Sequence, residues 1–181
     1  MKKILVSAAA FVLAVSMFTA CGGSASSAAP AESTPAGEPA SSSAEAAASD
    51  LAGMVSTIEA VNTVANPIDI DEMALEFDML IDPADVVSFA GVKSNDDGNC
   101  ATVLVLQAAE GKADALADTL NTYKADQAAM YSNYADDFSA AIEQIENGVV
   151  SAKGDYVVMV FANTEGASYD EIGKAVESVL G

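Results

Sequence analysis

Residues 101–111 read ATVLVLQAAEG, and residues 157–166 read VVMVFANTEG. Both runs are rich in β-branched and other apolar residues, which is typical of strands. A turn signal precedes each run, Gly98-Asn99 in one case and Gly154-Asp155 in the other, and a stretch with helical spacing follows. We interpret the two runs as matching parts of two similar halves, each built as strand, turn, strand and helix.

The partner strand of each run lies just before its turn. Residues 86–93 lead into the turn at 94–99, and residues 149–152 lead into Lys153-Gly154-Asp155. Together the two ββα-like halves predict an α+β fold with a four-stranded antiparallel sheet and helices on one face.

One or two helices are expected before the sheet. The first has apolar residues at helical spacing until Pro67 interrupts: Leu51, Met54, Val55, Ile58 and Val61. Asp69, with Glu72 three residues later, has the pattern of a capping box that opens a second helix. The core-facing side chains of that second helix are predicted to be Ile70, Met73, Phe77 and Leu80.

Three more helices are predicted after the first hairpin. The longest has one apolar face, made of Leu116, Leu120, Tyr123, Gln127, Met130 and Tyr134. The next ends at Gly148, which we interpret as a glycine C-cap. Ser168 and Glu171 form a capping box that opens the last helix.

The N-terminus has the pattern of a secretory signal. Lys2 and Lys3 precede residues 4–18, which carry no charge, and this run is too short to cross a bilayer as a helix. We therefore interpret residues 1–20 as a signal peptide that is removed.

The end of that segment, Phe18-Thr19-Ala20-Cys21, resembles the lipobox of bacterial lipoproteins, although leucine is more usual than Phe18 at the first position. The resemblance implies cleavage before Cys21 and a diacylglyceryl thioether on its sulfur, which anchors the chain to the outer face of the membrane. Two acyl chains anchor stably where one does not. The alternative is a secreted protein with a chance cysteine at this position.

Residues 21–50 are predicted to be the lipidated cysteine and a disordered spacer. From Gly22 the spacer consists almost entirely of Ala, Ser, Gly, Pro and Glu, which cannot build a core. Such a chain spans roughly 30 Å. Residues 51–181 are then one α+β domain.

Charge narrows the classes of partner. Loss of Lys2 and Lys3 leaves 5 of the 7 basic residues against 27 acidic ones, a net charge of −22. Because this charge repels phosphate backbones and the chain has no arginine, we exclude nucleic acid as a partner. Anionic lipid headgroups are repelled too, so the acyl chains on Cys21 must attach the protein to the membrane. Acidity also serves solubility alone in many exported proteins.

Few residues are available for catalysis, because histidine and tryptophan are absent along with arginine. Cys100 is predicted to be a small buried hydrophobe at the start of a strand rather than a nucleophile. We therefore expect no enzyme activity, no cofactor and no metal. Two acidic clusters have ligands that suit calcium, but helix capping and turn formation explain both. They are Asp69, Asp71 and Glu72, and Asn95, Asp96, Asp97 and Asn99.

Tyrosines are the recognition groups to expect if any face solvent, although their spacing favours packing. They are Tyr123, Tyr131, Tyr134, Tyr156 and Tyr169.

From about Leu51 to the end, and most clearly from Tyr134 to Ala162, the chain resembles the bacterial lipoprotein family catalogued as domain of unknown function 4358. The recognisable stretch is residues 134–163, YADDFSAAIEQIENGVVSAKGDYVVMVFAN. The likeness lies in a tyrosine before a short helix, Glu146-Asn147 at its end, and Lys153-Gly154 with Tyr156 opening the next strand. It implies a small exported domain, commonly lipid-anchored, in Gram-positive bacteria, and it transfers no functional residue.

Two functions stay open. One is a binding or protein-interaction module of the cell envelope, whose partner is an unknown envelope protein or small ligand. It predicts an exposed apolar or tyrosine-lined patch on the sheet. The alternative is a calcium-dependent or enzymatic envelope domain, which predicts a pocket of converging carboxylates.

Overall fold

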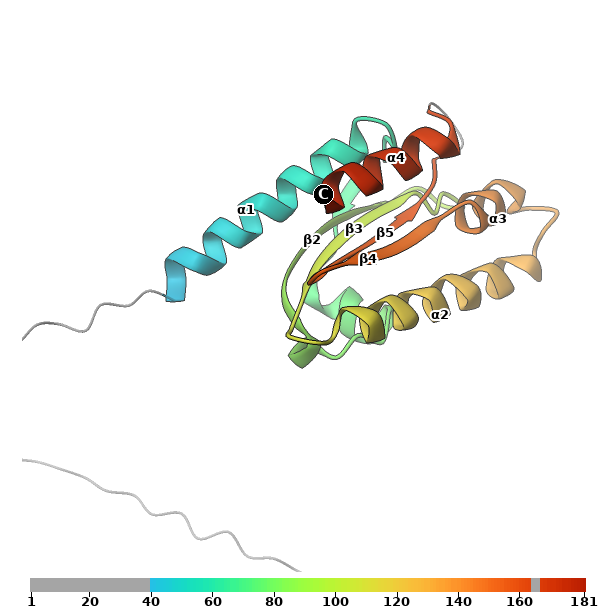
Figure 1. The fold of residues 1–181 in the computed structure, drawn as a ribbon. Helices are drawn as coiled ribbons and strands as arrows, with labels where there is room; N and C mark the ends of the chain where they lie inside the picture. The colour runs from blue at the N-terminus through green and yellow to red at the C-terminus, as the bar shows by residue number, and fades with distance from the viewer. Residues whose placement is uncertain (1–39, 164–166) are drawn as a thin grey trace, which may run out of the picture. The chain divides into compact units, whose positions relative to one another are not determined.

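The computed structural model describes residues 40–163 and 167–181, and it forms a sheet between two layers of helices (Figure 1). The predicted signal peptide and Cys21 lie outside these residues. The helices are α1 (Ala40–Glu59), α2 (Ala113–Ser132), α3 (Ser139–Glu146) and α4 (Tyr169–Leu180), with a short π-helix η1 (Ala74–Asp78) and a 3₁₀ turn η2 (Pro83–Asp85). The strands are β1 (Pro67–Asp69), β2 (Val86–Ser94), β3 (Thr102–Ala108), β4 (Val149–Lys153) and β5 (Tyr156–Phe161).

The two predicted hairpins are confirmed. β2 pairs with β3, β4 pairs with β5, and β3 and β5 lie side by side in the middle of the sheet. The strand order is β1-β2-β3-β5-β4, and every neighbouring pair is antiparallel. The α+β class is therefore confirmed.

The predicted number of strands is wrong, because the sheet has a fifth strand, β1. Its three residues pair with Val92–Ser94 of β2, in the place where the sequence suggested only an interruption at Pro67. Proline is accepted at the first residue of an edge strand, where its missing N–H costs no ladder bond. Three residues are also too few to show an alternating pattern.

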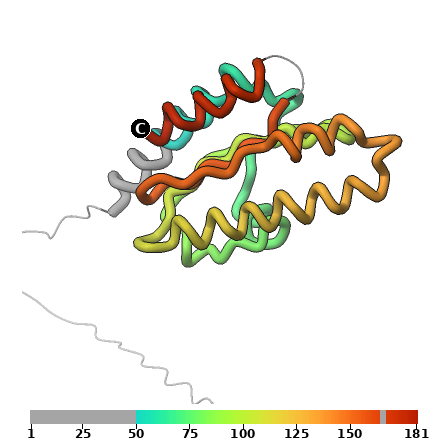
Figure 2. The backbone as a smooth tube through the Cα atoms, turned by 45° about the vertical axis from the view of Figure 1, so that its right-hand side comes forward, coloured from blue at the N-terminus to red at the C-terminus, as the bar shows by residue number. Residues whose placement is uncertain are grey.

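Helices cover both faces of the sheet, and the prediction that they lie on one face is wrong (Figures 1 and 2). α1 and α4 pack on one face against Val103, Val105, Val158 and Val160. α2 and residues 70–81 pack on the other face, together with Ile145 of α3. The reason is visible in β3 and β5: their apolar runs have no polar alternation, so both faces must be buried.

A buried asparagine connects the end of α1 to the end of β5. The Asn62 side chain donates a hydrogen bond to the Phe161 carbonyl at 3.3 Å and accepts one from the Asn163 N–H at 2.6 Å. Buried polar groups need such partners, and here they join segments far apart in the chain.

α1 begins at Ala40, earlier than the predicted start near Leu51 and inside the predicted spacer. Alanine has the highest helix propensity of all residues, so an alanine-rich stretch next to an anchored helix can extend it. Leu51, Val55 and Ile58 form the buried face, as predicted. Among the described residues, no helix is long and apolar enough to cross a membrane.

Gly148 has a different role from the predicted C-cap. α3 ends with Asn147 as its C-cap, and Gly148 is not among the positive-φ glycines of the described residues. A Cβ atom on Gly148 would instead lie 2.7 Å from the Val160 carbonyl oxygen and 2.9 Å from that of Ile145. Close approach of the backbone to β5 therefore requires glycine.

We predict that Gly148→Ala lowers the free energy of unfolding by about 1–3 kcal/mol through overpacking. The matched control is Gly173→Ala in α4, where nothing lies within 4 Å of the new Cβ. This control should raise stability by about 0.5–1 kcal/mol, because alanine suits a helix interior better than glycine. Urea denaturation measures both, and an unchanged midpoint for Gly148→Ala would contradict the assignment.

Candidate functional site

The segment between β1 and β2 carries the three most exposed large apolar side chains of the described residues. Met73 and Phe77 are each 67% exposed and Leu80 is 75% exposed. We call these three residues the apolar ridge. Monomeric proteins rarely leave large apolar side chains grouped in solvent without a function.

The predicted core face of this segment is wrong, except at Ile70, which is buried. The buried residues are Ala74, Leu75, Met79 and Ile81. The cause is η1, where the Met79 N–H donates to the Ala74 carbonyl five residues earlier, at 3.0 Å. A π-helical turn holds an extra residue and so shifts the face that a 3.6-residue period predicts.

The predicted cap is also displaced. Asp71, not Asp69, caps this segment, since its carboxylate accepts a hydrogen bond from the Ala74 N–H at 2.8 Å. Asp69 belongs to β1 and is exposed.

Two further features mark the ridge as a special surface. Leu80 has a left-handed backbone with φ of 56°, a conformation that costs a non-glycine residue roughly 1–2 kcal/mol. π-helical turns such as η1 occur frequently at functional sites. Backbone strain and exposed apolar area thus coincide at Leu80.

Carboxylates surround the ridge. Those of the segment are exposed and comprise Asp69, Asp71, Glu72, Glu76 and Asp78. One lysine contacts this group, because Lys93 of β2 lies 3.6 Å from Asp78. The local field is therefore negative, and it favours cationic groups.

A cleft of about 350 Å³ opens beside the ridge, between α2 and the β2–β3 turn. Tyr123, Gln127 and Tyr131 of α2 line one side, and the turn residues 94–100 line the other. We call it the tyrosine cleft. A hollow of about 300 Å³ lined by Met73 and Phe77 shares Ile68 and Lys93 with the cleft.

Aromatic contacts set the positions of the two cleft tyrosines. The Tyr123 ring stacks on Phe161 with centroids 6.0 Å apart, and the Tyr131 ring meets Phe138 edge-on at 5.5 Å. The prediction that most tyrosines are core residues holds only in part: Tyr134 is 60% exposed and the other four are half-buried.

The tyrosine hydroxyls stay protonated well above neutral pH. Burial, helped by the negative charge of Asp78, raises the pKa of Tyr123 to about 12. A hydrogen bond with the Cys100 thiol is the main cause that raises the pKa of Tyr131 to about 12. At neutral pH both groups are therefore neutral hydroxyls, and that of Tyr131 is engaged with the Cys100 thiol.

Cys100 is half-buried at the cleft and lies just before β3, whereas it was predicted to be buried at the start of that strand. Its N–H donates to Gln144 at 2.7 Å, and burial raises the pKa of its thiol. The thiol form is therefore favoured over the thiolate.

The two clusters considered for calcium have structural tasks. Besides the Asp71 cap, Asp96 accepts a hydrogen bond from the Asn66 side chain at 3.2 Å. Asn99 accepts from the Ala101 N–H and from the Gln144 side chain. Within residues 40–163 and 167–181, no group of three or more Cys, Asp or Glu side chains is placed to hold a metal ion.

Comparison with protein families matches residues 60–162 to the family described as Domain of unknown function (DUF4358). The chain belongs to this family. The DUF4358 match includes the ridge, the cleft and all five strands, while α1 and α4 lie outside it. Among curated proteins and among solved structures, the comparisons find no match.

Sequence reasoning missed the ridge in this DUF4358 domain, because Met73, Phe77 and Leu80 stand at the spacing of a buried helix face. Their charged neighbours gave no warning, because residues one apart on a helix lie on different faces. Leu75 is buried beside Glu76, and Met79 is buried beside Asp78.

We predict that Tyr123→Phe flattens the alkaline loss of stability. The folded pKa of about 12 lies above the ordinary value of 10.0, so folding favours the neutral phenol. This contribution is complete below pH 10 and is lost as pH rises towards 12. The variant should reduce the slope of unfolding free energy against pH there by up to about 1.4 kcal/mol per pH unit, one proton's effect.

Guanidinium denaturation between pH 7 and 12 measures this slope. Between pH 7 and 9 the wild type and Tyr123→Phe should run parallel, because the phenol is neutral in both folded and unfolded chains. Identical slopes between pH 10 and 12 would show that Tyr123 is not shielded by burial.

Proposed function

We propose that this chain is a lipid-anchored interaction module of the cell envelope, held through Cys21 at the outer face of the membrane. It binds a partner protein with a basic and apolar surface through the apolar ridge. The proposal assigns no catalytic step and no cofactor to the chain. The observation that carries it is the exposure of Met73, Phe77 and Leu80 among carboxylates.

The ridge supports binding by two separable effects. Complete burial of a Leu, Met or Phe side chain contributes about 1.5–3 kcal/mol, and the ridge residues are still two-thirds or more exposed. The surrounding carboxylates attract a basic partner and speed its approach, an effect that weakens as salt increases. Apolar contact thus gives affinity, and charge selects the partner.

The tyrosine cleft gives the same partner a second contact. Lysine and arginine side chains place their cations over tyrosine rings and hydrogen-bond to tyrosine hydroxyls. Tyr123 and Tyr131 supply these groups beside the carboxylates of Asp96 and Asp97, which also line the cleft. A side chain from a partner seated on the ridge reaches this cleft through the hollow at Lys93.

The anchor is supported by the sequence. Residues 1–20 have the pattern of a signal peptide, and Cys21 stands where the lipobox resemblance requires it. The acidic domain does not bind an anionic bilayer by itself, because like charges repel, so attachment depends on the acyl chains.

We predict that a photoreactive group on the ridge captures one partner in living cells. The full chain carries Phe77→benzoylphenylalanine, with Lys153→benzoylphenylalanine, exposed at the end of β4, as the matched control. The residue 77 version should form a discrete adduct whose partner peptide, identified by mass spectrometry, contains Lys or Arg. The residue 153 version should not form it.

Charge and anchor are tested in the same cells. Glu72→Gln with Glu76→Gln should reduce the adduct at least three-fold, and Glu110→Gln with Glu177→Gln, which removes equal exposed charge elsewhere, should leave it unchanged. Cys21→Ser should release the chain from the membrane fraction and abolish the adduct. An adduct that survives Glu72→Gln with Glu76→Gln refutes the basic partner, and a Cys21→Ser chain that stays in the membrane refutes the anchor.

A further inference from the structure

The outer edge of β2 is only partly paired. β1 pairs with Val92–Ser94, and the Ile70 N–H adds one bond to the Gly91 carbonyl at 2.9 Å. Among the described residues, no strand pairs with β2 beyond this point, although β3 follows its inner side as far as Val86. We call Val86–Ala90 the free edge.

An apolar groove of about 290 Å³ runs beside the free edge. Leu75, Ile81 and Pro83 form one wall, and residues 86–89 form the other. Val87 is 62% exposed and has no partner in β3, because the register shifts between Val86 and Ser88. The groove thus has room for apolar side chains next to backbone groups that can pair.

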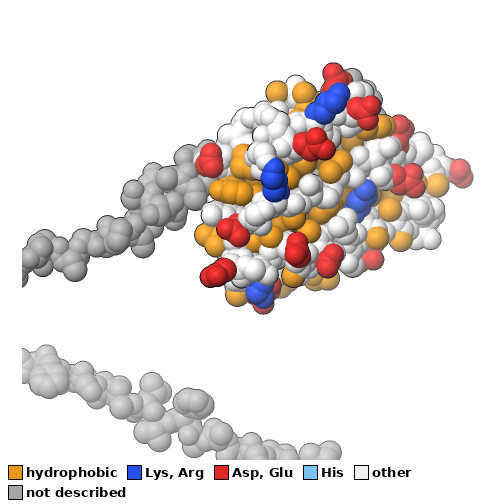
Figure 3. Space-filling model, viewed as in Figure 1, with side chains coloured by type: hydrophobic (Ala, Val, Ile, Leu, Met, Phe, Trp, Pro, Cys, Tyr) orange, Lys and Arg blue, Asp and Glu red, His pale blue; other side chains and the backbone are white. Residues whose placement is uncertain are grey.

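The other edge of the sheet is better protected than the free edge. Natural edges are blunted by lysine, proline or a bulge. β4 ends in Lys153, and the Lys124 ammonium donates to the carbonyls of Glu146 and Gly148 just before it. In the view of Figure 3, Lys side chains lie among the hydrophobic side chains between the upper helices and α2. The free edge reads VVSFA, and its one protective device is the bulge at Val87.

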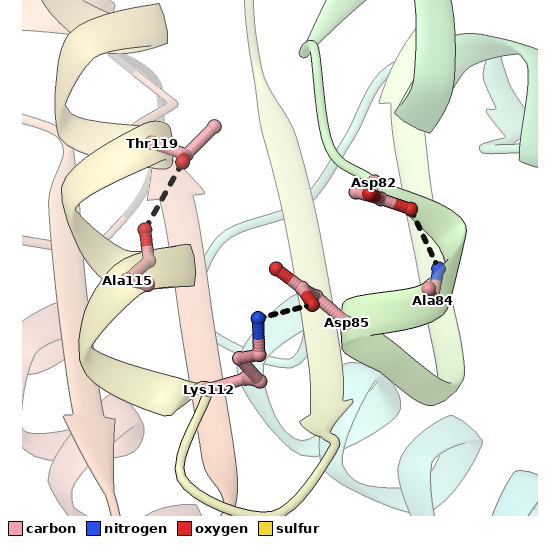
Figure 4. A network of polar contacts seen from close by, with 6 residues as sticks. All are labelled: Asp82, Ala84, Asp85, Lys112, Ala115 and Thr119. Carbon is pink, nitrogen blue, oxygen red and sulfur yellow. Dashed lines mark hydrogen bonds and ion pairs between the residues drawn. The ribbon is translucent and has the colours of Figure 1, made fainter.

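Polar contacts fix the end of the groove. The Asp82 carboxylate accepts a hydrogen bond from the Ala84 N–H at 2.9 Å, and Asp85 pairs with Lys112 at 2.7 Å (Figure 4). This ion pair joins the start of β2 to the start of α2. The wall at Pro83 is therefore held in place before any ligand arrives.

Charge decides which strand fits this edge. Glu72 lines the groove and Asp82 precedes Pro83, while the charge of Asp85 is paired with Lys112. A second copy would bring the same carboxylates to the same place, with a net charge of −20 on each full chain. An extended segment with alternating lysine or arginine meets the opposite charge.

The geometry points to strand addition at the free edge by an extended basic segment of a partner protein. Its backbone pairs with β2 between Val86 and Ala90, its apolar side chains enter the groove beside Leu75 and Ile81, and its cations meet Glu72. Glu72 borders both the ridge and the groove, but Met73, Phe77 and Leu80 do not line the groove, so the inference does not depend on the proposed function. In strand addition, backbone hydrogen bonds give affinity and the side-chain pockets give specificity.

The test uses the full chain and two synthetic peptides, acetyl-Lys-Val-Lys-Val-Lys-Val-amide and its glutamate counterpart. Amide hydrogen exchange is followed by NMR at Val87 and Phe89. At millimolar concentration the lysine peptide should slow exchange of at least one of these amides more than ten-fold. The glutamate peptide should slow it less than two-fold.

Two variants locate the binding. Val87→Lys, at an exposed position, should abolish the slowing by repelling the lysine peptide, and Val87→Thr, which keeps the β-branched shape, should preserve it. Leu80→Asn removes a ridge side chain that does not line the groove, so it should also preserve the slowing.

Three results would overturn the inference. They are equal slowing by both peptides, equal behaviour of Val87→Lys and Val87→Thr, and loss of slowing in Leu80→Asn alone. Loss of slowing in Leu80→Asn would place the peptide on the ridge, which supports the proposed function and refutes strand addition. Loss of the cellular ridge adduct, with the slowing of exchange intact, would refute the proposed function and leave strand addition standing.

Discussion

The packing of β3 and β5 between two helical layers is the constraint on which the structure depends. Side chains of these strands point alternately into two cores: Leu104 and Met159 meet α2, and Val105 and Val158 meet α1 and α4. All are fully buried, and each contributes on the order of 1.5–3 kcal/mol. Neither face of the sheet is therefore available to a partner.

This constraint decides where function can reside. An interaction patch on the sheet, which the sequence suggested, is wrong because helices cover both faces. Binding is left to the segment that crosses from β1 to β2, to the cleft at the end of α2, and to the strand edges. The segment 70–81 contributes to both the core and the surface. Leu75, Met79 and Ile81 are buried in the core. Phe77 and Leu80 face solvent.

Local signals predicted much of this fold. Both hairpins follow from apolar runs and turns, and the capping box of Ser168 and Glu171 is present as predicted. The likeness of the two halves did not predict that helices lie on both faces of the sheet, because it does not show which face each helix packs against. The ridge was missed because one π-helical turn moved Phe77 from the predicted core to the surface, and no period reveals such an insertion.

The central claim is that the sheet must be covered on both faces, and removal of α1 tests it directly. A chain beginning at Ala60 keeps the whole family match and Asn62 but loses the helix over Val103 and Val105. The comparison is with a chain beginning at Cys21, by urea denaturation and by binding of a hydrophobic dye. The shorter chain should lose its cooperative unfolding transition and bind more dye. If the two chains unfold with the same midpoint and slope, the account is contradicted, and this face of the sheet becomes a candidate surface for a partner.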